Sequence, residues 1–211
     1  MNTQEQLNQL AEIKSLMERS SRFLSLSGLS GVVAGIVAII SGLSAWFYLG
    51  DGSLKHPVVL TQQFMSLPID GMQIIVLASI GAATALLAIL SAFYFSFRKA
   101  KKSEHKVWDG TTKRMLINLF IPLVTGGLFC LALLFHGQYY LIASTTLVFY
   151  GLALINASRY TLNEIRYLGI CEIVLGMISS FMIGYGIIFW ILGFGLLHII
   201  YGITMYYKYD K

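Results

Sequence analysis

The chain has 211 residues, of which 56% are hydrophobic and only 12% are charged, and its formal net charge is +5. Soluble globular domains carry about 25% charged residues. A chain of this length has too little interior to hide so much apolar surface from water, so the composition excludes an ordinary soluble domain. It favours one compact multi-pass membrane protein whose partner is the lipid bilayer.

Residues 1–22 are polar and predict an amphipathic helix rather than a cleavable secretory leader. Apolar residues fall on one broad face of this helix, with Glu5, Glu12 and Arg19 opposite. Two interpretations stay open. The helix lies along the inner leaflet of the membrane, or it docks another subunit or a cytoplasmic protein partner.

Six apolar stretches follow, near 23–49, 72–97, 115–135, 139–158, 166–184 and 187–207. Each is close to or longer than the roughly 20 residues that a helix needs to cross a bilayer. Helices are expected because they hydrogen-bond their own backbone groups in lipid. The sequence therefore predicts an all-α membrane protein. A six-transmembrane-helix bundle occupies residues 23–207, preceded by the amphipathic N-terminal helix at 1–22 and followed by a cytoplasmic tail at 208–211.

Basic residues set the predicted orientation. With six spans, both termini, the loop at 98–114 and the link at 159–165 share one side of the membrane. All of the 15 Lys and Arg residues except Lys55 fall on that side. Because basic residues collect on the cytoplasmic face, we expect both termini to be cytoplasmic (N-in/C-in) in a bacterial cytoplasmic (inner) membrane.

Part of this charge is concentrated in the loop at 98–114. Its first basic residues, Arg98, Lys99, Lys101 and Lys102, are candidates for binding anionic lipid headgroups. The alternative is that the loop only fixes the topology. Nucleic acid is not an expected partner, because the charge sits on a membrane anchor without a nucleic-acid-binding module.

Glycines recur at intervals of seven residues, close to two helical turns. The sets are Gly28, Gly35 and Gly42, then Gly169 and Gly176, then Gly186 and Gly193, and Gly195 and Gly202. Small residues let membrane helices approach closely. These stripes predict either packing within one bundle or the seams of a homo-oligomer.

Two ionisable residues lie inside the last two spans. Glu172 is about 9 Å from the cytoplasmic end of its span and His198 about 13 Å from the end of the next, at 1.5 Å per residue. The short connection makes these spans antiparallel neighbours, so the two side chains are predicted to lie within reach of each other. Both also share a face with glycines of the stripes.

Intramembrane ionisable residues usually face a partner or an ion path. One interpretation is therefore a Glu172–His198 pair that holds a proton, as a relay or a proton-coupled carrier requires. The other is a hydrogen-bonded lock that orients two helices and moves nothing. Metal binding needs further ligands that the sequence does not supply at this depth.

Four more polar residues are predicted in the inner half of the bundle, namely Asn118, Asn156, Tyr167 and Ser27. Together they are candidates for lining a cytoplasm-facing polar cavity that reaches Glu172. Taken singly, such residues usually make helix–helix hydrogen bonds or helix caps.

The motifs HExxH and GxSxG and the phosphate-binding P-loop are missing. We therefore expect no enzyme, no cofactor and no metal. The leading hypothesis is a small carrier or channel for protons, ions or a small solute that uses the Glu/His pair. The alternative is a membrane scaffold or sensor without transport, acting on a cytoplasmic or membrane partner.

The strings MERSSRFLSLSGLSG (17–31) and NASRYTLNEIRYLGICEIVLG (156–176) resemble those of an uncharacterised family of small bacterial six-span integral membrane proteins. The resemblance covers most of the chain and implies the six-span fold. It implies no function and assigns no site residue.

Overall fold

The computed structural model describes residues 26–49, 70–102 and 108–211, which form helices and no strand. The helices are α2 (Gly28–Leu49), α4 (Gly71–Lys102), α5 (Gly110–Phe135), α6 (Ile142–Ala157), α7 (Asn163–Phe181), α8 (Gly186–Trp190) and α9 (His198–Tyr209). Short 3-10 turns, η1 (Tyr139–Leu141) and η2 (Ser158–Tyr160), flank α6, and a π-helical segment, η3 (Ile191–Leu197), joins α8 to α9. The all-α prediction is confirmed for these residues.

Five helices in the described ranges are long and apolar enough to cross a membrane. They are α2, α4, α5, the stretch Tyr139–Tyr160 around α6, and the continuous stretch Gly186–Tyr209 formed by α8, η3 and α9. Helix α7 is not among them because its 19 residues include Glu164, Arg166 and Glu172. Its length is nevertheless about 28 Å at 1.5 Å per residue, close to the thickness of a bilayer core.

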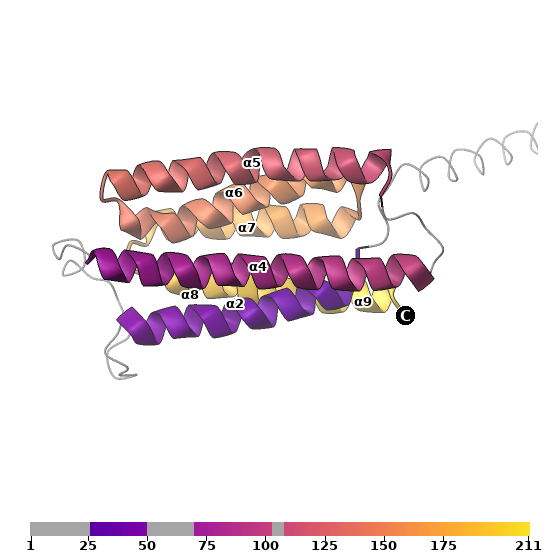
Figure 1. Cartoon of the computed structure of the whole chain (residues 1–211), viewed down its shortest axis with the longest axis horizontal. Helices are drawn as coiled ribbons and strands as arrows, with labels where there is room; N and C mark the ends of the chain where they lie inside the picture. The colour runs from indigo at the N-terminus through magenta and orange to yellow at the C-terminus, as the bar shows by residue number, and fades with distance from the viewer. Residues whose placement is uncertain (1–25, 50–69, 103–107) are drawn as a thin grey trace, which may run out of the picture.

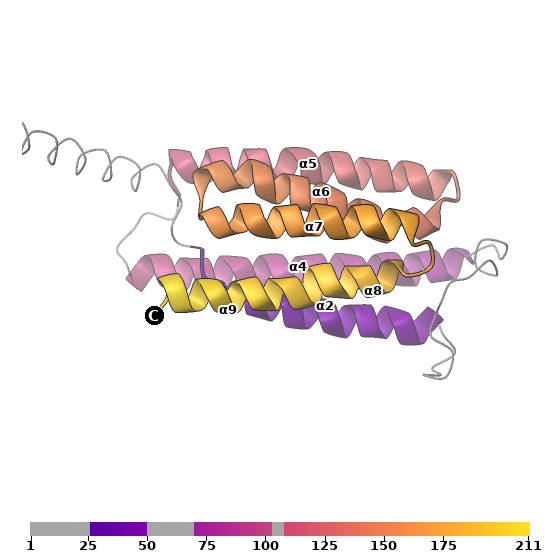
Figure 2. The ribbon, with the colours of Figure 1, turned by 180° about the vertical axis from the view of Figure 1, so that it is seen from behind.

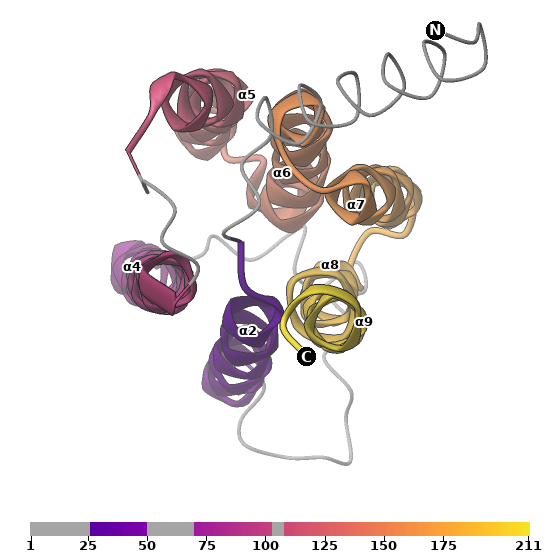
Figure 3. The same cartoon turned by 90° about the vertical axis from the view of Figure 1, so that its right-hand side faces the viewer.

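The helices form two groups of three. The first helix group contains α2, α4 and α8–η3–α9, with α2 packed against both of the others. The second helix group contains α5, α6 and α7, with α6 packed against both of the others. The end-on view in Figure 3 shows the two groups side by side. They meet along a seam where α6 and α7 pack against α8, η3 and α9, visible from behind in Figure 2.

Glycines bring the backbones of the first helix group together. A Cβ atom added at Gly35 would lie 2.6 Å from the carbonyl oxygen of Gly195, and one at Gly202 would lie 2.8 Å from the carbonyl oxygen of Gly28. No larger residue fits between α2 and the last span at these points. The predicted stripes of these two spans therefore face each other within one chain.

The second helix group is built in the same way. A Cβ atom at Gly151 of α6 would lie 2.5 Å from the carbonyl oxygen of Gly169 in α7, and one at Gly176 would lie 2.9 Å from the carbonyl oxygen of Ser144. The glycine faces predicted as candidate homo-oligomer seams are thus occupied by contacts inside the chain.

Charge is concentrated at one end of the bundle, which we call the basic end. Every Lys and Arg in the described ranges lies on segments that meet there, where α4 and α9 end and α2, α5 and α7 begin (Figure 1).

Helix α4 continues to Lys102, five residues beyond the predicted end of that span. Arg98 and the three lysines after it are therefore helical rather than part of a loop. Arg and Lys are good helix formers, and their apolar stems can lie along a membrane helix.

At the basic end, Asp210 connects the end of α9 to the beginning of α2 and to α4. Its Oδ2 accepts hydrogen bonds from Ser27 Oγ at 2.8 Å and from the backbone N–H of Gly28 at 2.9 Å. Its Oδ1 lies 2.6 Å from Lys99 Nζ near the end of α4. A carboxylate at the N-terminus of α2 pairs with unsatisfied N–H groups and with the helix dipole. We call this arrangement the Asp210 clamp.

The predicted N-terminal helix at 1–22 lies outside the described residues, as do residues 50–69 of the predicted outer loop and residues 103–107 of the predicted basic loop.

Candidate functional site

Three polar side chains meet at the seam between the two helix groups. Glu172 comes from α7, Tyr150 from α6 and His198 from the first position of α9. The Nδ1 atom of His198 lies 3.4 Å from Glu172 Oε1, and its Nε2 atom lies 2.8 Å from the hydroxyl oxygen of Tyr150. Glu172 is fully buried and His198 is 7% exposed. We call Tyr150, Glu172 and His198 the seam triad.

The π-helical segment makes room for the Glu172 carboxyl. A Cβ atom at Gly193 in η3 would lie 2.4 Å from Glu172 Oε2 and 2.5 Å from Leu147 Cδ2. Any side chain at this position would therefore collide with the carboxyl. π-Helical turns inside α-helices are rare and frequently lie at functional sites. Here the segment also directs the Gly193 carbonyl oxygen to within 3.0 Å of His198 Nδ1.

These contacts determine the tautomer of the neutral His198 ring. A carbonyl oxygen only accepts hydrogen bonds, so Nδ1 must carry the hydrogen that binds Gly193. In the neutral ring Nε2 is then the acceptor, and the Tyr150 hydroxyl donates to it. Phe194 packs against both rings, with centroid separations of 5.0 Å to Tyr150 and 6.0 Å to His198. Hydrogen bonds at Nδ1 and Nε2 thus fix the orientation of the His198 ring from both edges.

Glu172 is the member of the triad without a hydrogen bond. Both of its carboxyl oxygens are buried and lack a hydrogen-bond partner among the described residues. The 3.4 Å separation from His198 is within ion-pair distance, but the Nδ1 hydrogen is directed to Gly193. An unpaired neutral polar group costs about 1–3 kcal/mol to bury, and an unpaired charge costs several more. A negative charge on Glu172 therefore needs a partner that this arrangement does not provide.

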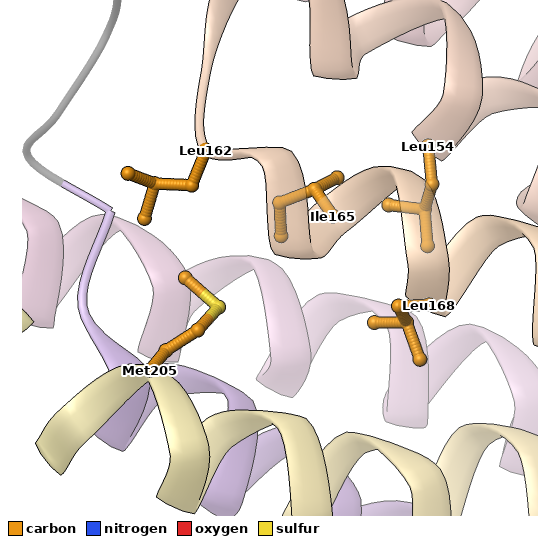
Figure 4. Close-up of a cluster of buried hydrophobic side chains, with 5 residues drawn as sticks. All are labelled: Leu154, Leu162, Ile165, Leu168 and Met205. Carbon is orange, nitrogen blue, oxygen red and sulfur yellow. The ribbon is translucent and has the colours of Figure 1, made fainter. Parts of the chain in front are cut away.

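An apolar cluster separates the triad from the basic end. It consists of Leu154, Leu162, Ile165, Leu168 and Met205, all at most 7% exposed. Leu168 precedes Glu172 by one turn of α7, and Met205 follows His198 by two turns of α9. Figure 4 shows Met205 extending from α9 toward the side chains of the second helix group. The cluster closes the seam on the side of the triad that faces the basic end.

Beyond this cluster, a second polar contact joins the two helix groups. Glu164, in the first turn of α7, forms an ion pair with Lys208 near the end of α9 and accepts hydrogen bonds from the Tyr209 hydroxyl at 3.0 Å. Lys208 is 58% exposed, so this ion pair is screened by water or headgroups and contributes little to stability.

Tyr167 and Asn156 do not join the triad. Tyr167 is 60% exposed. It lies five residues before Glu172, which turns it about 140° away around the helix. Asn156 is exposed near the end of α6. Among the described residues, neither side chain is hydrogen-bonded to the triad.

Asn118 and Ser27 also make contacts elsewhere. The Asn118 side-chain amide donates to the Arg114 carbonyl of its own helix at 2.8 Å, and Ser27 belongs to the Asp210 clamp. Of the six predicted intramembrane polar candidates, the structure brings together only Glu172 and His198.

The predicted lipid-binding residues have different surroundings. Arg98 and Lys101 are exposed at the end of α4, where Lys102 ends the helix. Lys99 instead reaches Asp210 and donates to the carbonyl of Leu26 at 2.9 Å. Lys99 is therefore committed to a contact within the chain.

Sequence reasoning missed Tyr150 and the role of Gly193. Tyr150 carried a usable signal, because it lies mid-span rather than in an interfacial aromatic belt. A phenol at that depth needs a hydrogen-bond partner from another helix. Gly193 was indistinguishable from the other glycines of the stripes, because a π-helical segment leaves no periodic pattern in the sequence.

No group of three or more His, Cys, Asp or Glu side chains with metal-binding geometry occurs in the part of the chain that the structure describes. Comparison with known proteins finds no significant match to a family model, a curated protein or a solved structure. Function must therefore be argued from the seam triad itself.

Proposed function

We propose that this protein is a small carrier or channel for protons, ions or a small solute, and not an enzyme, with the seam triad as its transport site. One observation carries the proposal. A carboxyl group without a hydrogen-bond partner is buried at the junction of two helix groups. Ionisable residues at such depth are costly and usually lie on substrate or ion pathways.

The proposed setting is the bacterial cytoplasmic membrane, crossed six times with both termini inside. The basic end of the bundle supports this orientation, since the described Lys and Arg residues gather there. Helix α7 is proposed as the remaining span. It lies between α6 and the last span, and two of its three charged residues, Glu164 and Arg166, stand in its first turn.

The seam offers a route to alternating access. Transport sites commonly lie near the midplane between two structural units that rock against each other. Here Tyr150 and Glu172 come from one helix group and His198 from the other. Relative movement of the groups would separate the triad and admit water to Glu172. In the arrangement seen, the carboxyl is sealed on the basic side by the apolar cluster, as an occluded state requires.

The test is flux into proteoliposomes that contain a trapped pH dye, driven by an imposed potential or a pH gradient. We expect flux with the wild-type protein and a rate equal to that of protein-free liposomes with Glu172→Gln. Glu164→Gln is the matched control, because it removes a carboxylate from the same helix outside the site, and its flux should match the wild type.

Equal flux in wild type and Glu172→Gln, with both proteins folded, would remove Glu172 from any transport path. Absence of flux in all three proteins, for protons and for alkali cations, would count against a free-standing proton or cation pathway through Glu172.

One observation favours the second candidate, a scaffold or sensor without transport. Both oxygens of Glu172 are inaccessible to solvent, and a dry core is what a structural lock requires. This function predicts no flux in the wild type, whereas the transport function predicts flux that Glu172→Gln abolishes, so the flux measurement distinguishes the two functions. Under either function Glu172→Leu should be at least as stable as the wild type, because a buried unpaired carboxyl is replaced by an apolar side chain.

A further inference from the structure

The surroundings of Glu172 restrict what the site can bind. Oε1 faces the Nδ1–H group of His198, a hydrogen-bond donor directed to the Gly193 carbonyl oxygen. Oε2 faces the Gly193 backbone, where an added Cβ atom would meet both Oε2 and the Cδ2 methyl group of Leu147. The phenol of the triad, Tyr150, is engaged with the opposite edge of the imidazole. Glu172 is therefore the only oxygen donor of the triad that is not already hydrogen-bonded.

Metal cations need more donors than this. Calcium takes six to eight oxygen ligands, and magnesium demands near-octahedral oxygen coordination. Transition metals take imidazole nitrogens as ligands, but the His198 nitrogen that faces Glu172 carries a hydrogen. A proton needs only one acceptor and almost no space, and space is scarce here, since a Cβ atom at Gly193 would collide with Glu172 Oε2.

We infer that the ligand of the seam triad is a single proton, bound by Glu172, and that His198 orients this site without accepting the proton from it. The inference rests on the proposed function and deepens it by naming the transported species as a proton. Binding of that proton by Glu172 can be tested without any net transport. In the sealed arrangement Glu172 is a neutral carboxylic acid. When the seam opens, its O–H bond breaks toward a water molecule, leaving a carboxylate and a hydronium ion.

The tautomer of His198 rules out direct transfer between the two residues in the sealed arrangement. Nδ1 already carries a hydrogen, so it has no lone pair available for the proton of Glu172. Only Nε2 can accept one, and it faces Tyr150 on α6. Among the described residues, the titratable groups of the triad around Glu172 are His198 from the last span and Tyr150 from α6. Beside them, Cys171 Sγ and the Tyr201 hydroxyl lie 3.9 Å apart at the same seam.

Infrared spectroscopy of the full-length protein in lipid tests this inference independently of transport. A protonated carboxyl gives a carbonyl stretching band that is well separated from carboxylate bands and shifts on transfer to D2O. At neutral pH we expect this band in the wild type and in Glu164→Gln, and its loss in Glu172→Gln. We further expect that adding Na+, K+, Mg2+ or Ca2+ at neutral pH leaves the band of the wild type unchanged.

Two outcomes would overturn the inference. Loss of the band on adding one of the cations would identify a metal-ion site. A carboxylate signal at Glu172 together with a doubly protonated His198, read from 15N chemical shifts with His198→Gln for assignment, would identify an ion pair. The cation titration uses the wild type alone, so it remains informative if a variant fails to fold.

Flux measurements separate this inference from the proposed function. The infrared band without flux would support the proton site and contradict the carrier or channel. Flux without the band would support transport and contradict the proton site.

Discussion

Gly193 determines how much space the Glu172 carboxyl has. Because a Cβ atom there would lie 2.4 Å from Glu172 Oε2, Gly193→Ala must displace the carboxyl or η3. Overpacking of this kind typically costs about 1–3 kcal/mol. We expect Gly193→Ala to lower the unfolding temperature in detergent micelles and to abolish the flux that depends on Glu172.

Gly81→Ala is the matched control. Nothing lies within 4 Å of a Cβ atom added at Gly81 in α4, and alanine is the better helix former by about 1 kcal/mol. This variant should be as stable as the wild type or slightly more stable. If Gly193→Ala and Gly81→Ala behave alike, Gly193 is not confined by Glu172.

Asp109, at the start of α5, makes a pH-dependent contribution to the stability of the folded state. It accepts hydrogen bonds from the Thr112 backbone N–H at 2.7 Å and from the Thr112 hydroxyl at 2.8 Å, and the backbone bond is the main cause that lowers the pKa of Asp109 below its ordinary 3.8. A lowered carboxyl pKa stabilises the folded state above the unfolded pKa, and that contribution is lost as the pH falls through the folded value. Asp109→Ala should cost about 1 kcal/mol at neutral pH, as removal of a helix N-cap does.

The difference between wild type and Asp109→Ala should therefore shrink below about pH 4, near the ordinary carboxyl pKa. Thermal unfolding at a series of pH values checks this. A difference that stays constant down to pH 2 would mean that the carboxylate charge plays no part in the cap.

At the residue scale, sequence reasoning placed Glu172 and His198 near each other because the connection between their spans is short and both depths follow from helix rise. It did not place Tyr150, since the sequence does not specify which third span packs on the pair. It also placed Asn118 and Tyr167 near the site from depth alone. Depth does not determine the direction of a side chain around the helix.

At the scale of elements, the Asp210 clamp ties the beginning of α2 and the end of α4 to the end of α9. Lys99 and Asp210 are only 19% and 9% exposed, so removing one charge leaves the other poorly solvated. We expect Asp210→Asn to lower stability by about 1–3 kcal/mol, between the values for surface and buried ion pairs. Thermal unfolding of the full-length chain measures this.

Glu164→Gln is the comparison at the same end of the bundle. Its partner Lys208 is 58% exposed, so we expect a loss below about 1 kcal/mol. If Asp210→Asn is no more destabilising than Glu164→Gln, the clamp contributes no more than an ordinary surface ion pair.

The apolar runs predicted the helix boundaries to within a few residues, because a helix in lipid must hydrogen-bond its own backbone N–H and C=O groups. Helix α4 extended further than predicted because its basic residues are compatible with continued helix. The glycine stripes predicted close packing correctly, but not which helices are paired. Gly28 and Gly202 face each other from opposite ends of the sequence, and periodicity contains no information about such partners.

At the scale of the whole molecule, two groups of three helices meet along one seam, and the residues of the seam triad come from both. No sequence pattern predicted this division, since the second helix group is continuous in the chain while the first is formed from its two ends. Under the proposed transport function, the division gives a reason for a costly carboxyl at this junction. A titratable group at a junction between two units responds to their separation, whereas one inside either group would not.

Cys171 can report on whether the seam opens. It is a partly buried free thiol on α7, with Sγ 3.9 Å from the Tyr201 hydroxyl of the last span. Met205 is 4% exposed in the apolar cluster on the basic side of the triad. Truncating it should cost about 2–5 kcal/mol and loosen the closure. In a Cys130→Ser background, we expect Met205→Ala to speed labelling of Cys171 by a charged thiol reagent applied from the basic end.

Leu86→Ala is the control for this labelling experiment, because Leu86 is 59% exposed on α4 and takes no part in the closure. Its labelling rate should equal that of the background protein. Equal rates in all three proteins would mean that the cluster does not limit access to the seam, and the route from the basic end to Glu172 would have to lie elsewhere. Faster labelling in Met205→Ala alone would locate the closure between the two helix groups, where the proposed relative movement would expose the carboxyl.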